Sequence, residues 1–293
     1  LWAYAFIAGL SPSIVRAVTM FSFLAYAMHL NRPTNSFNII ALSMLFILLV
    51  KPIFLFQVGF QMSYAAVFAI VWIYPKMQRF WYPDHFFIRK IWQLLSVSVA
   101  AQLGVLPISL FYFHQFPALF FVANLLIIPF LGLILGLGIL VIFLALMDTL
   151  PTTLVLVYDQ IIKLMNTTVG WVAHQEGFIF KDIPFDAMQL VLGYVVIISL
   201  VVFLSRPKWK SAVILLSGVI GIQSWSLWNQ LGLHEKEALI LAHRSRNSVL
   251  LHQTGSTLHI FTSDSLNLGN LDKGFAIAER IQRTAIEPLK NHY

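Results

Sequence analysis

Residues 101–130, AQLGVLPISLFYFHQFPALFFVANLLIIPF, decide the fold of this chain. The stretch is apolar enough to lie in a bilayer, yet it holds three prolines together with amide and imidazole side chains. A proline leaves a helical carbonyl without its donor, and a buried amide needs a hydrogen-bonding partner. Such features are tolerated at membrane depth only inside protein or along a wet cavity. The stretch is therefore predicted to help line a pathway.

The composition extends this interpretation to the whole chain. Of its 293 residues, 59% are hydrophobic and 11% are charged, whereas a soluble domain has about 25% charged residues. Several apolar runs exceed the length of about 18 residues that is typical of a membrane span. We therefore expect an all-α polytopic membrane protein with about seven or eight membrane-embedded helices. One of them, residues 118–128, has only the length of a half-helix.

Two basic loops, residues 75–90 and 206–210, are predicted to be cytoplasmic because cytoplasmic loops carry an excess of lysine and arginine. An even number of crossings must then separate them, but only three full spans lie between: residues 91–113, 130–147 and 187–204. The count becomes even if the half-helix also crosses. The chain after residue 228 would then lie outside the cytoplasm.

Two further segments have patterns of their own. Residues 152–175 alternate apolar and polar residues with a helical period, which predicts an amphipathic helix in the interface or against the bundle. Residues 229–293 form a small strand-rich tail after a membrane domain of residues 1–228. The tail is predicted to contain strands at 238–243, 248–253 and 257–261 and a helix at 273–289.

Polar side chains within the apolar segments are the candidate functional residues. Arg16 lies just after the Ser11-Pro12 helix start, where a helix N-terminus plus a guanidinium favours an anion site; the alternative is an arginine that extends to the interface. Gln57, Gln61 and Tyr64 lie on one helix face. They form either interhelical hydrogen bonds or an uncharged wall for a passing polar solute.

The same two interpretations, interhelical hydrogen bonds or a polar wall for a passing solute, apply to residues of the opening stretch: Gln102, His114 and Asn124. His114 is predicted to be an interfacial cap rather than a catalytic base, because no carboxylate is near in the sequence to orient it. Structural breaks or close-packing positions are predicted at Pro12, Gly59, Pro107, Pro117 and Pro129.

The residues that catalysis needs are scarce. The sequence has no cysteine, no P-loop, and nine scattered histidines without HxH or HExxH spacing. Embedded carboxylates are essentially absent from the first half of the chain. These observations argue against a proton-coupled pump, an ATPase, a hydrolase and a metal or cofactor site.

Three blocks of sequence resemble the ComEC-type competence proteins. Residues 9–17, GLSPSIVRA, are similar to that family's G-L-S-P-S-x-x-R-A motif, and residues 52–63, PIFLFQVGFQMS, to its P-x-x-x-F-x-x-G-F-Q-L-S motif. The third block matches the family's AQL…P…FP…NL pattern at Ala101-Gln102-Leu103, Pro107, Phe116-Pro117 and Asn124-Leu125.

The resemblance implies a bacterial cytoplasmic-membrane channel that passes single-stranded DNA inward during natural transformation. Its expected partners are a competence DNA receptor and a cytoplasmic motor ATPase. It also implies an upstream OB-like domain, which residues 1–10 would follow as a helix remnant, and a downstream metallo-β-lactamase-like domain. The tail resembles a degenerate start of that last domain, but its HxHxDH zinc motif is absent from these residues, so no enzyme is expected.

Two other classes of protein remain as alternatives. A small-solute permease would use the broken helix at residues 107–129 as its binding site. A membrane enzyme would need a titratable group from upstream of Leu1.

Overall fold

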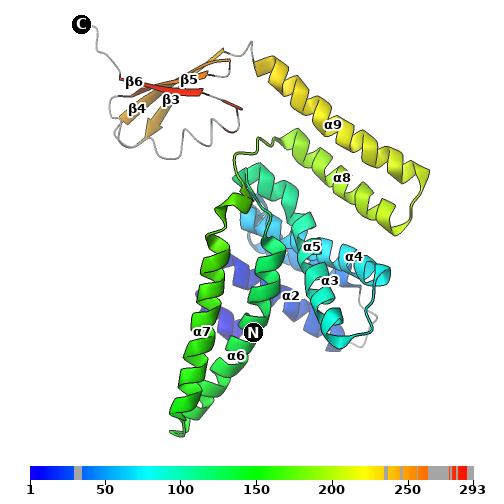
Figure 1. Cartoon of the computed structure of the whole chain (residues 1–293), viewed down its shortest axis with the longest axis vertical. Helices are drawn as coiled ribbons and strands as arrows, with labels where there is room; N and C mark the ends of the chain where they lie inside the picture. The colour runs from blue at the N-terminus through cyan, green and yellow to red at the C-terminus, as the bar shows by residue number, and fades with distance from the viewer. Residues whose placement is uncertain are drawn as a thin grey trace. The chain divides into compact units, whose positions relative to one another are not determined.

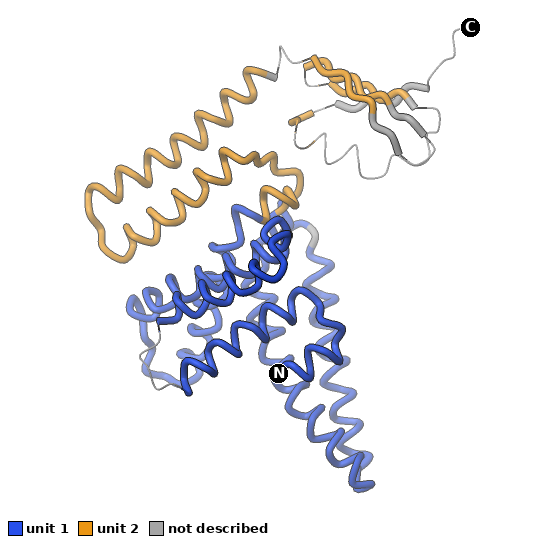
Figure 2. The backbone as a smooth tube through the Cα atoms, turned by 180° about the vertical axis from the view of Figure 1, so that it is seen from behind, with its two compact units in different colours: residues 1–108, 116–180 blue, residues 109–115, 181–293 orange. Residues whose placement is uncertain are grey.

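The structure, a computed structural model, describes residues 1–29, 35–233, 237–244, 247–255, 257–262, 277, 279–281 and 283–288. The chain divides into two compact units (Figure 2). The first contains Leu1–Ile108 and Phe116–Phe180, and the second contains Ser109–Gln115 and Lys181–Tyr293.

The first unit is helical and is built around one helix, α4 (Val58–Phe80). The elements before it are α1 (Trp2–Ile7), α2 (Pro12–His29), α3 (Ser36–Val50) and the 3₁₀ turn η1 (Pro52–Phe56). Pro12 opens α2 because its fixed φ suits the first helical position. Asn35 caps α3, since its side chain accepts a 3.0 Å hydrogen bond from the Phe37 amide.

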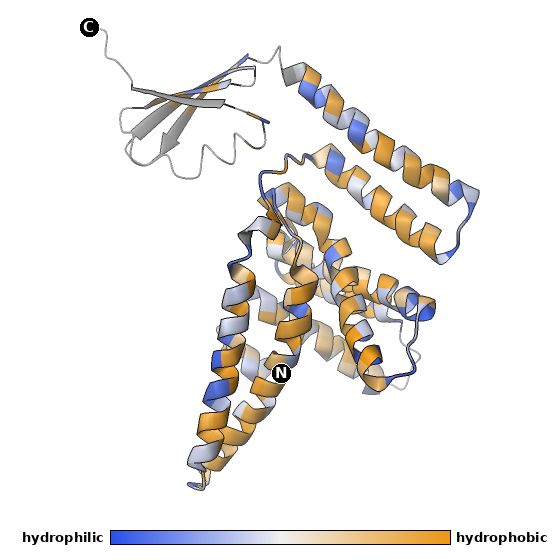
Figure 3. Cartoon of the chain, in the orientation of Figure 1, coloured by the Kyte–Doolittle hydropathy of each residue, from blue (hydrophilic) through white to orange (hydrophobic). Residues whose placement is uncertain are grey.

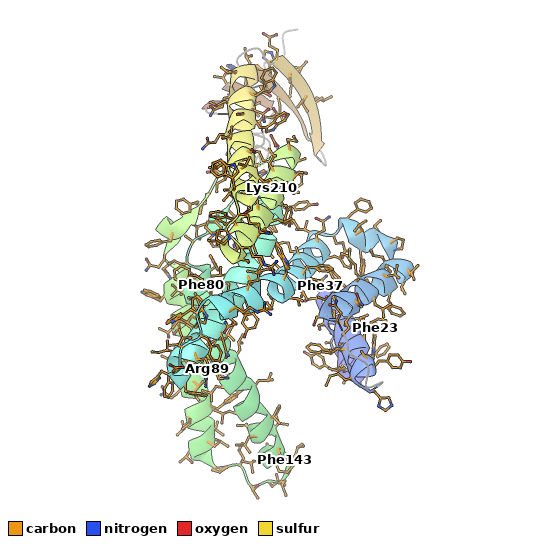
Figure 4. All side chains as sticks on the ribbon, turned by 90° about the vertical axis from the view of Figure 1, so that its right-hand side faces the viewer. Phe23, Phe37, Phe80, Arg89, Phe143 and Lys210 are labelled. Carbon is orange, nitrogen blue, oxygen red and sulfur yellow. The ribbon has the colours of Figure 1, made fainter. Side chains whose placement is uncertain are left out.

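Both α2 and α3 pack against α4. Buried residues of α3 and α4 form the core of this cluster: Ile40, Ile47, Phe60 and Tyr64. Aromatic contacts extend the packing, with Phe23 edge-on to Phe46 at 5.7 Å and Phe37 stacked on Phe68 at 6.3 Å (Figure 4).

The next helix, α5 (Phe86–Phe113), approaches α4 closely at Gly104. A Cβ on Gly104 would stand 2.4 Å from the Ala69 Cβ and 2.5 Å from the Ala65 carbonyl oxygen. Only glycine allows this approach without a shift of the backbone.

A helical hairpin completes the first unit. The helices α6 (Phe120–Leu146) and α7 (Thr152–Ala173) lie side by side in antiparallel directions (Figure 1). The short strand β1 (Phe116–Pro117) enters the hairpin, and β2 (Ile179–Phe180), after the 3₁₀ turn η2 (Glu176–Phe178), leaves it. The two strands pair, so they close the base of the hairpin.

The second unit contains a helix pair and a sheet. The helices are α8 (Ala187–Ser205) and α9 (Trp209–Leu233), and the strands are β3 (Glu237–Arg244), β4 (Asn247–Thr254), β5 (Thr257–Thr262) and β6 (Arg283–Pro288). The order β3-β4-β5-β6 is antiparallel except for the parallel β5–β6 pair. Leu251, Leu258 and Ile260 form its buried core.

The predicted fold class is confirmed. Five described helices, α4, α5, α6, α8 and α9, are long and apolar enough to cross a membrane, and α3 is a shorter apolar helix (Figure 3). The chain is therefore a multi-pass helical membrane protein with a small strand-containing C-terminal region. Strands β3, β4 and β5 cover the three predicted strands within one residue at each end.

Three predicted elements are wrong in whole or in part, and two of them involve breaks between helices. The half-helix at 118–128 does not exist, because α6 continues through Pro129, as α5 continues through Pro107. A long apolar helix tolerates the single hydrogen bond that a proline removes, since its other backbone groups stay paired. The loop predicted at 75–90 shrinks to residues 81–85 because α4 runs past Pro75 to Phe80.

The helix predicted at 273–289 is also wrong over residues 283–288, which form β6. Ile286 pairs with Ile260 of β5, so the sheet provides the backbone hydrogen bonds that a helix would otherwise make internally. Most of the remaining residues of that prediction lie outside the described residues.

Candidate functional site

Arg16 is buried in the first unit although it is charged. It lies in the second turn of α2 and is only 6% exposed. Its guanidinium reaches α4 at Gly59, where Nη2 would be 3.9 Å from a Cβ. The first sequence motif thus meets the second, since a Cβ at Gly59 would be in ordinary van der Waals contact with the guanidinium.

The charge of Arg16 has no described counterion. Its Nε is buried without a hydrogen-bond partner, and the single ion pair among the described residues joins Lys163 to Asp159. The first amides of α2 add the positive end of the helix dipole. An unpaired guanidinium near a helix N-terminus favours an anion, and a phosphate group matches its planar donor fork.

Tyr64 holds α4 to α3 beside Arg16. The Tyr64 side chain is 3% exposed, and its hydroxyl lies 3.2 Å from the Ser43 Oγ. Because the Ser43 hydroxyl donates to the Ile40 carbonyl at 2.8 Å, the Tyr64 hydroxyl is the donor in this pair. This is the interhelical hydrogen bond that the sequence left as one of two interpretations. Ser43 itself was not identified from the sequence, because nothing local marks a partner 21 residues away.

The two glutamines of the predicted stripe have different surroundings. Gln61 donates from Nε2 to the Leu55 carbonyl at 2.9 Å, which fixes the η1 turn against the start of α4. Gln57 is the exposed N-cap residue of α4, and its carbonyl accepts from the Phe60 and Gln61 amides. The face is therefore not a uniform polar wall: its exposed polar residue is Gln57.

His114 ends α5 in the left-handed conformation, with φ of 53°. Its Nδ1 lies 3.2 Å from the Ile183 carbonyl oxygen, and its own carbonyl accepts from the Ile183 amide at 2.9 Å. These contacts tie the end of α5 to the segment that precedes α8. They give His114 a capping role.

The other candidates of the opening stretch are half-buried on separate helices, Gln102 on α5 and Asn124 on α6. Neither is hydrogen-bonded to Arg16 among the described contacts. Pro117 lies in β1, which separates α5 from α6, so the break in this stretch is at residues 114–119.

A second polar cluster was missed in the sequence. The Asp186 carboxylate caps α8 and accepts hydrogen bonds from Trp225 Nε1 at 2.9 Å and Asn229 Nδ2 at 2.7 Å on α9. The capping-box spacing of Asp186 and Gln189 was the available signal. With all its donors supplied by the protein, this carboxylate is structural. No group of three potential metal ligands occurs in the described part of the chain.

Comparisons with known proteins agree with the three motif blocks. The sequence model of one protein family, described as Competence protein, matches residues 1–207. A curated protein of Bacillus subtilis (strain 168), described as ComE operon protein 3, is 34% identical over 127 residues. This match covers 43% of the present chain and 16% of the relative, so the aligned part is a small fraction of that protein's length. No solved structure matches the chain.

Proposed function

The chain belongs to the competence protein family, and from this premise we propose that it is part of a channel that carries single-stranded DNA across the bacterial cytoplasmic membrane. The observation that carries the proposal is the buried Arg16, which lies where the first two sequence motifs meet. Its Nε has no hydrogen-bond partner, and it forms no ion pair among the described residues. A DNA strand carries a negative charge on every phosphate, so its entry requires at least one fixed positive group. A single guanidinium can attract a phosphate and still release it.

The predicted topology supports an entry role. If the 81–85 loop is cytoplasmic, α4 begins at the outer face, and the proximity of Gly59 to Arg16 puts the guanidinium near that face as well. The strand would meet Arg16 before it passes deeper. Gln57, Gln102 and Asn124 remain our further path candidates, whereas Gln61, Tyr64 and His114 already have structural partners.

The remaining parts of the proposal follow from this role. A conduit without an ATP-binding loop needs an external motor, so a cytoplasmic ATPase and a surface DNA receptor are the partners we propose. We also propose that residues 1–228 form the membrane domain and that residues 229–293 form a tail outside the cytoplasm. A small-solute permease is less well supported, because the half-helix that suggested its binding site is part of the continuous helix α6.

The test is transformation of a naturally competent cell whose own protein carries Arg16→Ala. We expect transformation to fall about 10- to 100-fold, since a hydrogen bond to a charged group contributes about 1.5–3 kcal/mol. The amount of protein in the membrane and the binding of labelled DNA at the cell surface should stay unchanged. Arg16→Lys, which keeps the charge but loses the planar donor fork, should give an intermediate value.

The matched control is Arg79→Ala, which removes the same side chain from an exposed position at the other end of α4. It should transform like the wild type. If cells with Arg16→Ala transform at the wild-type frequency and contain a normal amount of the protein, the proposal loses its basis.

A further inference from the structure

The α6–α7 hairpin combines an entirely apolar helix with an amphipathic one. The most apolar window of α6 has a mean hydropathy of 3.0 and no buried residue within the protein, and Phe143 on α6 is 58% exposed (Figure 4). Its 27 residues correspond to a length of about 40 Å. A bilayer core of about 30 Å is the environment for such a helix.

The partner helix α7 must follow α6 into that environment. Its 22 residues span about 33 Å and pack beside α6, with the Tyr158 hydroxyl against Gly138. The pairing of β1 with β2 holds the far ends of the hairpin together. A helix fixed in this way along a membrane-spanning neighbour cannot lie flat in the interface by itself.

The two faces of α7 differ in character. The side toward α6 carries residues at helical spacing that are half-buried and mostly apolar: Leu154, Tyr158, Ile161, Ile162 and Met165. The opposite side carries a polar stripe, which we define as Asp159, Gln160, Lys163, Asn166 and Thr167. Figure 3 shows hydrophilic segments alternating with apolar ones along α7.

The polar stripe has few partners within the protein. Lys163 and Asp159 form an ion pair at 2.6 Å, but their side chains remain 67% and 49% exposed. The Thr167 hydroxyl donates to its own helix, and no described side chain of another element bonds Gln160, Lys163 or Asn166. Such a stripe is unfavourable against acyl chains, and polar groups at membrane depth face protein or water.

We propose that α7 crosses the membrane together with α6 and that its polar stripe faces a water-filled pathway. The loop charges support this assignment independently. With α7 as a crossing, four helices, α5 to α8, separate the two basic loops, so both loops lie on one side without a half-helix. The paired Asp159 and Lys163 give the wall little net charge, which suits a surface along which a charged strand slides.

The identity of DNA as the molecule that passes along the stripe rests on the proposed function, whereas the crossing of α7 and the access of water to its stripe do not. Water access is tested by single cysteines, for which the 293 residues provide a cysteine-free background; any cysteine elsewhere in the full-length protein is replaced. Gln160→Cys and Asn166→Cys probe the stripe, and their neighbours Ile161→Cys and Met165→Cys are matched controls at the same depth. The probe is a membrane-impermeant, cationic methanethiosulfonate reagent.

The stripe cysteines should react at least about tenfold faster than their neighbours, because only the stripe meets water. At the helix ends, Thr153→Cys and His174→Cys should react from opposite sides of the membrane. Labelling of both ends from one side would show a helix lying in the interface and would overturn the proposal. Equal, slow labelling of stripe and control positions would overturn it too, as would a disulfide between stripe cysteines of two copies.

Transformation then separates the two hypotheses. A bulky thiol reagent attached at Asn166→Cys should reduce DNA uptake, whereas treatment of Met165→Cys should not. If the stripe cysteines are accessible to water but their modification leaves DNA uptake unchanged, the water-filled pathway is supported. The proposal that DNA passes along it is then contradicted.

Discussion

At the scale of single residues, the site depends on how closely α4 approaches Arg16. Gly59 leaves room for an ordinary contact but not for a long side chain, since its Cβ would be 3.9 Å from the guanidinium Nη2. We expect Gly59→Ala to transform like the wild type and Gly59→Leu to lose about tenfold, because the leucine displaces the guanidinium. Transformation frequency at equal protein level is the measurement.

The control for Gly59→Leu is Gly132→Leu on α6, where a Cβ would meet nothing within 4 Å. Leucine favours helices more than glycine at both positions, so helix propensity affects the two variants alike. Equal transformation by both variants would contradict a specific role for the space beside Arg16.

The sequence singled out Arg16 as the informative charge, but it did not identify what surrounds it. Its motif was recognisable along the chain, whereas its neighbour Gly59 belongs to another motif and another helix. The Ser43–Tyr64 contact was missed for the same physical reason: helical periodicity describes one face of one helix and not the register between two.

At the scale of elements, the α4–α5 contact is the tightest that the helices of the first unit make through a glycine. Gly104→Ala places a methyl group against the Ala69 side chain and the Ala65 backbone. Because backbone cannot rotate away as a flexible side chain can, we expect the free energy of unfolding to fall by about 1–3 kcal/mol. A lower thermal midpoint of the purified protein in detergent should report this loss of stability. The control is Gly136→Ala, whose Cβ would meet nothing within 4 Å and which should leave the midpoint unchanged.

The α8–α9 pair offers a second prediction at this scale. Asp186→Ala removes a helix cap together with the acceptor of Trp225 and Asn229. We expect a loss of about 2–4 kcal/mol of stability from the combined cap and hydrogen bonds. Tryptophan fluorescence during denaturant unfolding should report it. The control is Asp182→Asn, at an exposed position with φ of 61°. It should leave the free energy of unfolding within about 0.5 kcal/mol of the wild-type value.

The sequence predicted long apolar helices well and helix breaks poorly. Proline was given the effect that it has in a soluble helix, but Pro75, Pro107 and Pro129 all lie inside long helices. In a membrane the alternative to a helix is unpaired backbone in lipid, so a helix continues through a proline that would end it in water. Among the prolines predicted to break the opening stretch, only Pro117 lies in the break at residues 114–119, which begins at a left-handed His114.

At the scale of the whole molecule, topology is the property that a fusion experiment can test. We expect a reporter enzyme that is active only outside the cytoplasm to be active when fused after Leu233. The same reporter should be inactive when inserted in the 81–85 loop or between α8 and α9. The helix ends beside the first loop carry Lys76, Arg79, Arg89 and Lys90, and the second connection carries Arg206, Lys208 and Lys210. An active reporter at either basic loop would reverse the orientation proposed for the tail and for Arg16.

The tail shows which long-range features a sequence cannot reveal. Strands β3, β4 and β5 follow one another through short turns, so their alternating pattern was sufficient to predict them. Strand β6 pairs in parallel with β5, and a parallel pair requires a long connection that no local pattern specifies. The local pattern therefore predicted a helix over this segment, whereas pairing with β5 makes residues 283–288 a strand.

The burial of Arg16 also imposes an order on biosynthesis. Gly59 is synthesised 43 residues after Arg16, an interval of about 2–9 s at ordinary ribosome speed. During that time the guanidinium lacks the cover of α4, and α2 is not among the helices apolar enough to cross by themselves. We therefore expect stable integration of α2 by the insertion machinery to wait for α4, so that the first helices enter the bilayer as a group rather than one at a time.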